Sequence, residues 1–157
     1  MDVLIAAFRM AFPRGDERVR LVIVGEGPER SRLQELAGGD GRIVLSGATF
    51  EVAAFYRAFD VFVSAARFEP FGLAILEAMA AGLPIVATKT LGPCEFVADE
   101  RVLWVDIGDG GALSAKLKQA SALGRVRYRY DLANFSRERA AKDIEASIAT
   151  SPPGIAI

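Results

Sequence analysis

The apolar residues of this chain fall into short runs separated by longer amphipathic stretches. Residues 19–24 form a β-branched run that ends in a Gly-Glu-Gly-Pro turn, which is typical of a strand that leads into a helix. The same patterns predict further strands at 42–46, 61–65, 84–88 and 102–105, and helices at 2–12, 28–37, 50–59, 72–81, 93–98 and 111–123. Strands that alternate with helices predict right-handed crossovers and a parallel sheet covered on both faces. The expected fold class is therefore α/β, with a doubly wound parallel sheet.

The carboxy-terminal part of the chain carries weaker signals. Residues 125–130 alternate arginine with valine or tyrosine, which favours either an edge strand or an extended connector. A last helix is expected to begin at Ser136. Residues 151–157 contain two prolines and a glycine and are expected to be a flexible tail. Because the whole length suits one hydrophobic core, we expect residues 1–150 to form a single domain.

Charge and composition exclude some classes of function. The chain has 19 basic and 20 acidic residues, so it lacks the excess of positive charge that holds a nucleic-acid backbone. Its single cysteine, Cys94, cannot form an internal disulfide, and this favours a reducing compartment such as the cytoplasm. The first residues do not have the pattern of a signal peptide. The most apolar region, residues 73–88, is interrupted by Glu77 and Pro84 and is not expected to span a membrane.

The chain is nevertheless apolar for a free-standing domain. Hydrophobic residues make up 52% of it, and the mean hydropathy is +0.26. We therefore expect part of its surface to face another domain.

Ligands of open α/β sheets lie beyond the carboxyl ends of the strands, and three loops there carry unusual residues, at 25–28, 46–50 and 66–72. The helix after the third loop holds Glu77, the only charged residue between Pro70 and Thr88. A lone carboxylate among apolar residues needs a hydrogen-bond donor, and the two hydroxyls of a ribose could supply it. An ion pair between Glu77 and a buried arginine or lysine is an equally good interpretation.

The start of the same helix is a candidate anion site. The first backbone N–H groups, of Gly72, Leu73 and Ala74, lack partners within the helix and lie at the positive end of its dipole. Such a site suits a diphosphate, and the missing side chain of Gly72 would let it approach. Glu69 would then lie near the group attached to the distal phosphate, although considered singly it reads as an exposed loop carboxylate.

Two other features have simpler interpretations. Gly25-Glu26-Gly27 lacks the third glycine of a dinucleotide fingerprint, because Arg30 occupies that place, and alone it indicates a tight turn. Cys94 is expected to pack in the structure, since the chain has no histidine to activate it as a nucleophile.

One stretch resembles the signature of group 1 (family 4) glycosyltransferases. Glu69 and Glu77 enclose Phe-Gly-Leu, and the sequence continues Glu-Ala-Met-Ala-Ala-Gly-Leu-Pro to residue 84. Supporting matches are Val24-Gly25-Glu26-Gly27-Pro28, Leu45-Ser46-Gly47 and Gly92-Pro93-Cys94-Glu95. The resemblance covers residues 2 to about 109.

This resemblance implies the carboxy-terminal, Rossmann-like domain of a two-domain GT-B transferase that closes on a nucleotide-sugar. By resemblance, Glu77 holds the ribose hydroxyls, the N–H groups at the start of its helix hold the diphosphate, and Glu69 is the catalytic residue beside the donor sugar. The loop that carries Ser46 would flank the base. The donor-binding residues expected in this way are Gly25, Gly27, Ser46, Ala48, Thr49, Phe71, Gly72, Leu73, Ala74 and Glu77.

The resemblance also implies transfer with retained anomeric configuration, no metal and no cofactor, with a nucleoside-diphosphate sugar as substrate. Synthesis of a glycan, lipopolysaccharide or glycolipid is the expected setting. The location would be cytoplasmic or peripheral on the cytoplasmic membrane face, with membrane contact only through the acceptor domain. Neither the nucleotide, the sugar nor the acceptor is identified by the sequence.

Two departures from the family pattern bear on activity. The amino-terminal acceptor domain is missing, as is the segment that usually carries an arginine and a lysine for the diphosphate, so the chain is expected to be an incomplete and inactive fragment by itself. Leu91 also replaces the first glycine of a pair before Glu95. The alternative function is a non-catalytic GT-B-like binding or assembly module that needs a partner domain. An NAD-dependent oxidoreductase is disfavoured by the incomplete glycine fingerprint.

Overall fold

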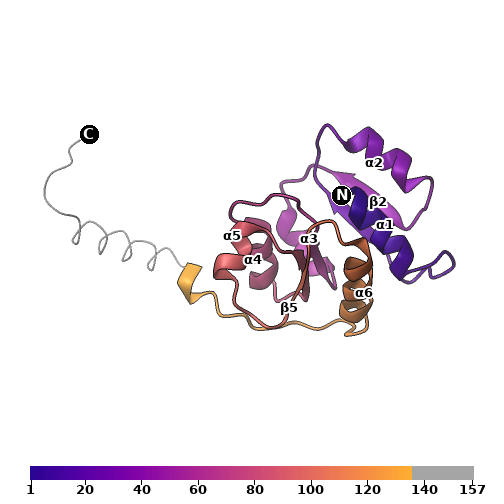
Figure 1. Ribbon diagram of the computed structural model, residues 1–157. Coiled ribbons are helices and arrows are strands. Elements are labelled where there is room, and N and C mark those ends of the chain that lie inside the picture. The colour runs from indigo at the N-terminus through magenta and orange to yellow at the C-terminus, as the bar shows by residue number, and fades with distance from the viewer. Residues whose placement is uncertain (136–157) are drawn as a thin grey trace, which may run out of the picture.

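The computed structural model describes residues 1–135, in which strands and helices alternate (Figure 1). The strands are β1 (Leu21–Val24), β2 (Ile43–Gly47), β3 (Phe62–Ser64), β4 (Ile85–Thr88) and β5 (Val102–Val105). The helices are α1 (Asp2–Ala11), α2 (Arg30–Ala37), α3 (Val52–Ala58), α4 (Leu73–Ala80), α5 (Leu91–Phe96) and α6 (Gly110–Ser121), followed by a 3-10 turn at Ala133–Phe135. Every strand and helix predicted within this range is present, with small shifts at the ends. The predicted helix from Ser136, the domain boundary at 150 and the tail at 151–157 lie outside the described residues.

All strand pairs are parallel, as predicted, but the strands are divided between two sheets. One sheet has the order β3-β4-β5, and the other pairs β1 with β2. The register is regular in the first sheet, whereas β2 carries an irregularity where Val24 pairs with Gly47. The α/β class is therefore confirmed, and the division between β1 and β3 is a feature that the sequence pattern did not predict.

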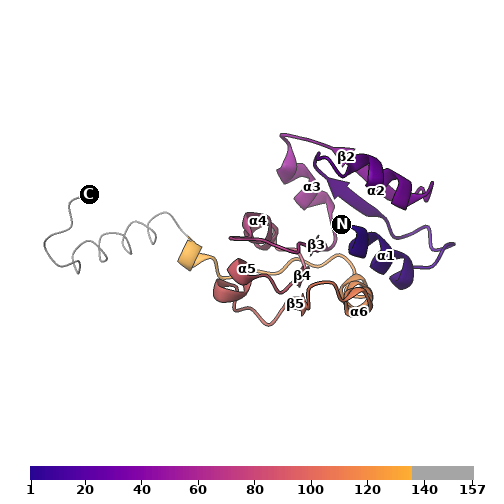
Figure 2. The ribbon, with the colours of Figure 1, turned by 45° about the horizontal axis from the view of Figure 1, so that its top comes forward.

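Helices cover both faces of the strands, so the successive side chains of β4 alternate between two cores. Val86 packs in one core with residues of α1, α2 and α6, whereas Ile85 and Ala87 pack in a second core with residues of α3 and α4. Figure 2 shows α4 and α6 on opposite sides of β4. Because successive side chains of a strand point to opposite faces, a strand covered on both sides buries every residue, and all of β4, including its last residue Thr88, is buried.

The segment at residues 125–130 is an extended connector and not an edge strand. It is held against the loop after α4 by two hydrogen bonds. The backbone N–H of Tyr128 donates to Gly82 O at 2.7 Å, and the side-chain hydroxyl of Tyr130 donates to Leu83 O at 2.8 Å. Arg127 donates to the carbonyl of Phe59 at 2.8 Å. These contacts go to loops and a helix end, so no strand ladder forms.

A buried arginine fixes the turn after α1. Arg42 is only 2% exposed, and its guanidinium donates to both carboxylate oxygens of Asp40, at 3.0 and 2.9 Å. It also donates to the carbonyls of Phe12 and Pro13, and it lies 5.4 Å from the centre of the Phe8 ring. Its charge is thus matched by a carboxylate and by carbonyl oxygens, which a buried cation requires.

Candidate functional site

A cleft of about 950 Å³ lies between the two sheets. At the carboxyl ends of the strands it is lined by six of the residues predicted to bind the donor or act on it, namely Gly25, Ala48, Thr49, Glu69, Ala74 and Glu77. The other five predicted residues do not line the cleft, although they lie in or directly beside the same loops: Gly27, Ser46, Phe71, Gly72 and Leu73. The structure therefore brings together the loops after β1, β2 and β3 at one opening.

Glu77 is exposed on α4 and is held by a tyrosine. The Tyr56 hydroxyl, on α3, donates to Glu77 Oε2 at 2.9 Å, and Glu77 forms no ion pair within residues 1–135. The expectation of a buried carboxylate is thus wrong, because this side of α4 faces the open cleft. The alternative of a buried ion pair is not found either.

Tyr56 is itself buried, with 8% of its surface exposed. This burial raises the pKa of the Tyr56 hydroxyl above its usual value, and the neighbouring Glu77 carboxylate raises it further. Tyr56 therefore remains protonated and can serve as a fixed hydrogen-bond donor. Tyr56 thus orients one carboxylate oxygen of Glu77, Oε2.

The start of α4 offers two open N–H groups. In the described part of the chain, those of Leu73 and Ala74 have no hydrogen-bond acceptor, as expected for the first turn of a helix. The third predicted donor, the Gly72 N–H, instead donates to Glu69 Oε1 at 2.8 Å. Glu69 is half-buried, and its carboxylate therefore sits beside the start of the helix.

The loop before α4 requires its glycine. Gly72 has a φ of 87°, in the left-handed region, and a Cβ there would approach Pro93 Cγ to 2.6 Å. A Cβ on Gly92 would collide with the carbonyl of Pro70. The start of α5 therefore packs backbone to backbone against the loop that carries Glu69, whereas Leu91, in place of the expected glycine, is exposed.

The turn after β1 is closed by an ion pair. Arg30 Nη1 lies 2.9 Å from Glu26 Oε1, so the arginine in place of a third glycine covers the turn. Gly25 has a φ of 125° and donates through its N–H to Gly47 O at 2.9 Å. This geometry links the loops after β1 and β2, and it agrees with the interpretation of a tight turn.

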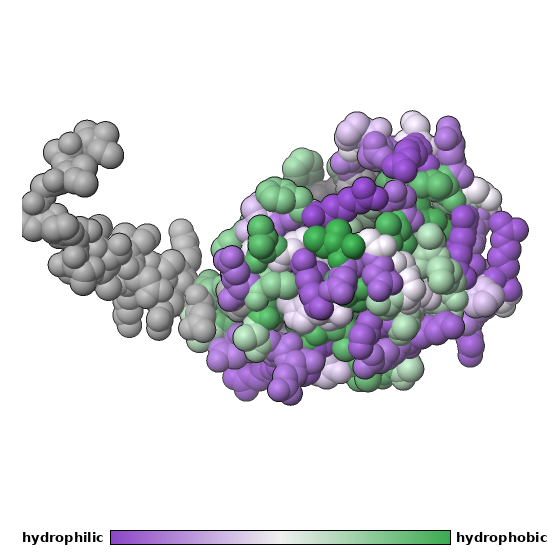
Figure 3. Space-filling view, viewed as in Figure 1, coloured by the Kyte–Doolittle hydropathy of each residue, from purple (hydrophilic) through white to green (hydrophobic). Residues whose placement is uncertain are grey.

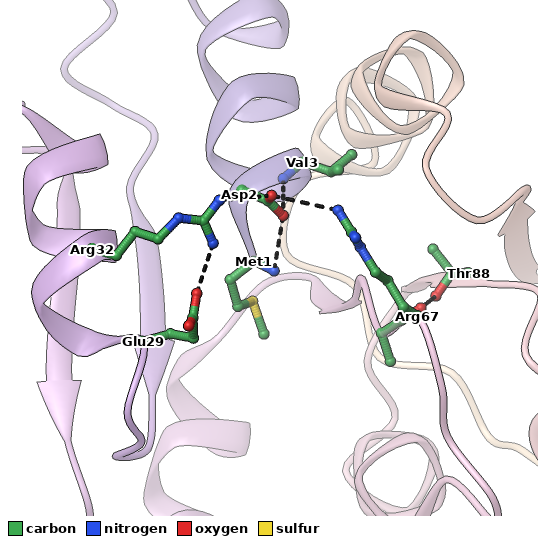
Figure 4. A network of polar contacts seen from close by, with 8 residues as sticks. Met1, Asp2, Val3, Glu29, Arg32, Arg67 and Thr88 are labelled. Carbon is green, nitrogen blue, oxygen red and sulfur yellow. Dashed lines mark hydrogen bonds and ion pairs between the residues drawn. The ribbon is translucent and has the colours of Figure 1, made fainter.

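A second polar network connects the two halves of the fold at the same end (Figure 4). The N-cap position of α1 is Met1, and Asp2 Oδ1 accepts from the Val3 N–H at 3.0 Å. Its other oxygen lies 3.3 Å from Arg32 Nη2 on α2 and 3.5 Å from Arg67 Nη2 in the loop after β3. Asp2 thus bridges elements on both sides of the division between the sheets.

The sequence model described as "Glycosyl transferases group 1" matches residues 1–122. The chain belongs to this family. Among curated relatives, it is 39% identical over 115 residues to the lipopolysaccharide core biosynthesis glycosyltransferase LpsE of Rhizobium meliloti, a match that covers 71% of this chain and 34% of that protein. It is 38% identical over 119 residues to a GDP-mannose-dependent alpha-mannosyltransferase of Mycobacterium tuberculosis, with coverage of 73% and 30%. This group 1 glycosyltransferase chain thus spans about a third of the length of these relatives.

Solved structures show the fold. A glycosyltransferase from Rickettsia africae superimposes with a TM-score of 0.78 at 22% identity, over 96% of this chain and 44% of that one. The lipopolysaccharide outer core galactosyltransferase WaaB gives a TM-score of 0.74 at 19% identity, over 95% of this chain and 44% of that one. Anabaena HepE, solved in complex with UDP and glucose, superimposes with a TM-score of 0.66 at 24% identity, over 92% of this chain and 44% of that one. The fold of this group 1 glycosyltransferase chain is that of the GT-B enzymes.

Sequence reasoning missed two contributors to the site of this group 1 glycosyltransferase chain. In the sequence, Tyr56 has the position of an aromatic core residue on a helix. It lies 21 positions from Glu77, so no local pattern predicts the contact between the two. Pro93 was part of a supporting motif, but its packing against Gly72 was not foreseen. No helix within residues 1–135 is long and apolar enough to cross a membrane.

Proposed function

We propose that this domain binds the nucleoside-diphosphate sugar donor of a retaining glycosyltransferase, at the carboxyl ends of its strands. The observation that carries the proposal is the pairing, on α4, of an exposed carboxylate with an open helix start. Glu77 is held by Tyr56, and the N–H groups of Leu73 and Ala74 have no acceptor in the described part of the chain. The two ends of one unit, a ribose and a diphosphate, match these two groups in chemistry.

The spacing along α4 suits this unit. Ala74 and Glu77 are three positions apart, which corresponds to about 4.5 Å of rise along a helix, or almost one turn. The ribose hydroxyls would donate to Glu77, and the negative phosphate oxygens would accept from the N–H groups at the positive end of the helix dipole. Gly25, Ala48 and Thr49 line the same opening from the other sheet and would face the base.

Glu69 would lie beside the donor sugar. Its bond from the Gly72 N–H fixes the carboxylate just beyond the helix start, on the wall of the cleft. In this proposal transfer depends on two effects: the helix start stabilises the charge of the departing diphosphate, and Glu69 positions the sugar and its acceptor. No metal or further cofactor takes part, and anomeric configuration is retained.

The whole enzyme would need more than this domain. The proposal includes an acceptor domain, an acceptor in glycan, lipopolysaccharide or glycolipid synthesis, and a cytoplasmic location with membrane contact through the acceptor domain alone. Support comes from relatives named for lipopolysaccharide core biosynthesis and for GDP-mannose-dependent transfer. One relative is named for GDP-mannose, and Anabaena HepE was solved with UDP and glucose, so both guanosine and uridine donors belong in the test.

The experiment is a calorimetric titration of the chain with UDP-glucose and with GDP-mannose. We expect saturable binding of at least one donor, weakened about tenfold or more, or ~1.4 kcal/mol, by Glu77→Gln. Glu35→Gln, an exposed carboxylate on α2, is the matched control and leaves the affinity unchanged. Equal affinity in Glu77→Gln and the parent chain would overturn the proposal.

A non-catalytic assembly module is the second candidate. It is favoured by exposed apolar side chains, such as Phe68 at 77% and Leu91 at 76%. Figure 3 shows hydrophobic residues interspersed with hydrophilic ones on one face of the molecule. A stable complex with a second polypeptide, together with no detectable binding of either donor, would support this candidate against the first.

A further inference from the structure

The extended connector at residues 125–130 contacts the carboxyl ends of both helices that carry the Tyr56–Glu77 hydrogen bond. In Figure 1 the connector runs from the end of α6 to the 3-10 turn. Its contacts go to residues that precede β3 and β4, so they lie at the end of the strands opposite to the donor loops. The connector therefore approaches the two helices from the side away from the predicted ligand.

The helix α3 depends on contacts outside itself. Of its seven residues, only Tyr56 is buried, and a helix this short is not stable by itself in water. Its carboxyl end is held by the connector, because Arg127 Nη2 donates to the carbonyls of Arg57 at 3.0 Å and of Phe59 at 2.8 Å. Arg125 Nη2 donates to the same carbonyl of Arg57 at 3.2 Å. Carbonyls in the last turn of a helix lack partners within it, and the helix dipole favours a cation beside them.

The same connector packs directly on the turn after α4. Gly82 has a φ of 74°, and a Cβ there would lie 2.6 Å from the carbonyl oxygen of Tyr128. The backbone N–H of Tyr128 and the hydroxyl of Tyr130 donate to two successive carbonyls of this turn. The turn is tied to the helix, since the N–H of Leu83 donates to Ala78 O at 3.0 Å. The connector thus fixes the end of α4 as well as that of α3.

An arginine directly before β5 holds the connector in place. The guanidinium of Arg101 lies 5.3 Å from the ring centre of Tyr128 and 4.5 Å from that of Tyr130, and it donates to the carbonyl of Arg129 at 3.2 Å. Both carboxylate oxygens of Asp99 accept from the same guanidinium, at 2.8 and 2.6 Å. Because the connector is bound to this third element, it can hold the ends of α3 and α4 at a fixed distance.

The contact between Tyr56 and Glu77 depends on that distance. Their hydrogen bond is 2.9 Å long, and a displacement of α3 by about 1 Å away from α4 would take the two oxygens beyond hydrogen-bond range. Arg57, whose carbonyl accepts from both arginines of the connector, is the residue next to Tyr56. A change at the end of α3 therefore reaches the tyrosine hydroxyl directly.

We propose that the connector sets the position of the Glu77 carboxylate and that Arg127 is a positioning residue for donor binding, acting through α3 and Tyr56. Arg127 does not line the cleft, so its effect reaches the donor only through the helix. The effect on donor affinity rests on the function proposed above, whereas the effect on the Glu77 carboxylate does not. The two effects are therefore measured separately.

The first measurement is the ¹³C chemical shift of the Glu77 side-chain carboxyl in the ligand-free chain, by nuclear magnetic resonance. Tyr56→Phe gives the value without the hydrogen bond, and we expect Arg127→Ala to move the signal toward that value. Arg129→Ala is the matched control, because it removes an exposed arginine of the same connector, and it should leave the signal in place. Tyr130→Phe, which removes one hydrogen bond at the other end of the connector, should act in the same direction as Arg127→Ala, and it replaces that variant if Arg127→Ala does not fold.

A Glu77 signal that stays in place in Arg127→Ala would overturn the proposal. So would a signal that is the same in Tyr56→Phe and in the parent chain, because the connector would then have no hydrogen bond to set. Thermal unfolding of each variant establishes that it is folded at the temperature of the measurement.

The second measurement is a double-mutant cycle on donor affinity, by calorimetry, with whichever of UDP-glucose and GDP-mannose binds more tightly. We expect Arg127→Ala to weaken binding about fivefold in the parent chain and by less than about twofold in Tyr56→Phe, where the supported hydrogen bond is already absent. Equal losses in the two backgrounds would overturn the proposal, since Arg127 would then not act through Tyr56. If neither donor binds the parent chain, the proposed function fails, and the carboxyl signal alone decides the role of the connector.

Discussion

The hydroxyl of Tyr56 lies 2.9 Å from Oε2 of Glu77, and this contact joins α3 to α4 at the wall of the cleft. The tyrosine is buried, whereas the carboxylate is exposed, so the ring anchors an acidic group that water can reach. The same hydroxyl also lies 3.3 Å from the carbonyl of Ala74, one turn earlier on α4. A carboxylate fixed in this way loses little conformational freedom when a ligand binds it.

Removal of this hydroxyl should weaken donor binding without unfolding the domain. We expect Tyr56→Phe to lower the affinity for the preferred nucleotide-sugar about tenfold, because a hydrogen bond to a charged group is lost while the ring remains in the core. Calorimetry measures the affinity, and thermal unfolding should show little change. Tyr128→Phe, outside the cleft, is the matched control. An unchanged affinity in Tyr56→Phe would mean that the tyrosine does not position Glu77 for the ligand.

Gly72 should tolerate no side chain. With its φ of 87° and Pro93 Cγ 2.6 Å from the place of a Cβ, Gly72→Ala should destabilise the domain by about 1–3 kcal/mol. Urea unfolding measures the change. Gly27→Ala is the control, since no atom lies within 4 Å of the place of its Cβ. If the two variants unfold at the same urea concentration, the inferred close packing of α5 on the start of α4 would be contradicted.

The ion pair of Asp40 and Arg42 should make stability depend on pH in the acid range. Hydrogen bonds from Arg42 lower the pKa of Asp40 from 3.8 to about 2. A carboxyl whose pKa is lowered by folding stabilises the fold fully above its unfolded pKa, and this contribution is lost as the pH falls through the folded pKa. The contribution of Asp40 is therefore present above pH 3.8 and disappears toward pH 2.

Acid unfolding of Asp40→Asn provides the measurement. Its stability should fall less steeply than that of the parent chain as the pH drops from 3.8 to about 2, because asparagine does not titrate there. Asp60→Asn is the control, since that exposed carboxylate lies 4.0 Å from its nearest arginine partner, Arg125. Parallel curves for Asp40→Asn and the parent chain would show that this ion pair has no part in the acid sensitivity.

The hydrophobic pattern was enough to locate every strand and helix within residues 1–135, because each signal is local. The strand β4 shows why: three consecutive apolar residues and a β-branched threonine between a proline and a lysine are readable without tertiary information. Pairing between strands is not local. The division between β1 and β3 is a tertiary feature, and residues 21–24 and 61–65 read the same in sequence whether or not their strands are paired on both sides.

The same limit applies to the site. The signature placed Glu69, Gly72 and Glu77 around one helix, and the structure has all three at the start or on the side of α4. The exposure of the Glu77 side chain could not be predicted, since its helix is apolar on nearly every side and the open cleft beside it is a tertiary feature. The hydrogen bond from the Gly72 N–H to the Glu69 carboxylate was missed for a different reason: the loop could equally have left this N–H group open.

The central claim, that the start of α4 holds the diphosphate of the donor, is tested most directly by amide chemical shifts on addition of UDP. We predict saturable shifts at Leu73 and Ala74, whose N–H groups are open, and none at Ala112, where the Asp109 carboxylate already accepts from the N–H at 2.8 Å. Glu77→Gln should require a higher UDP concentration for the same shifts. Saturable binding of UDP that leaves the Leu73 and Ala74 amides unmoved would contradict the account.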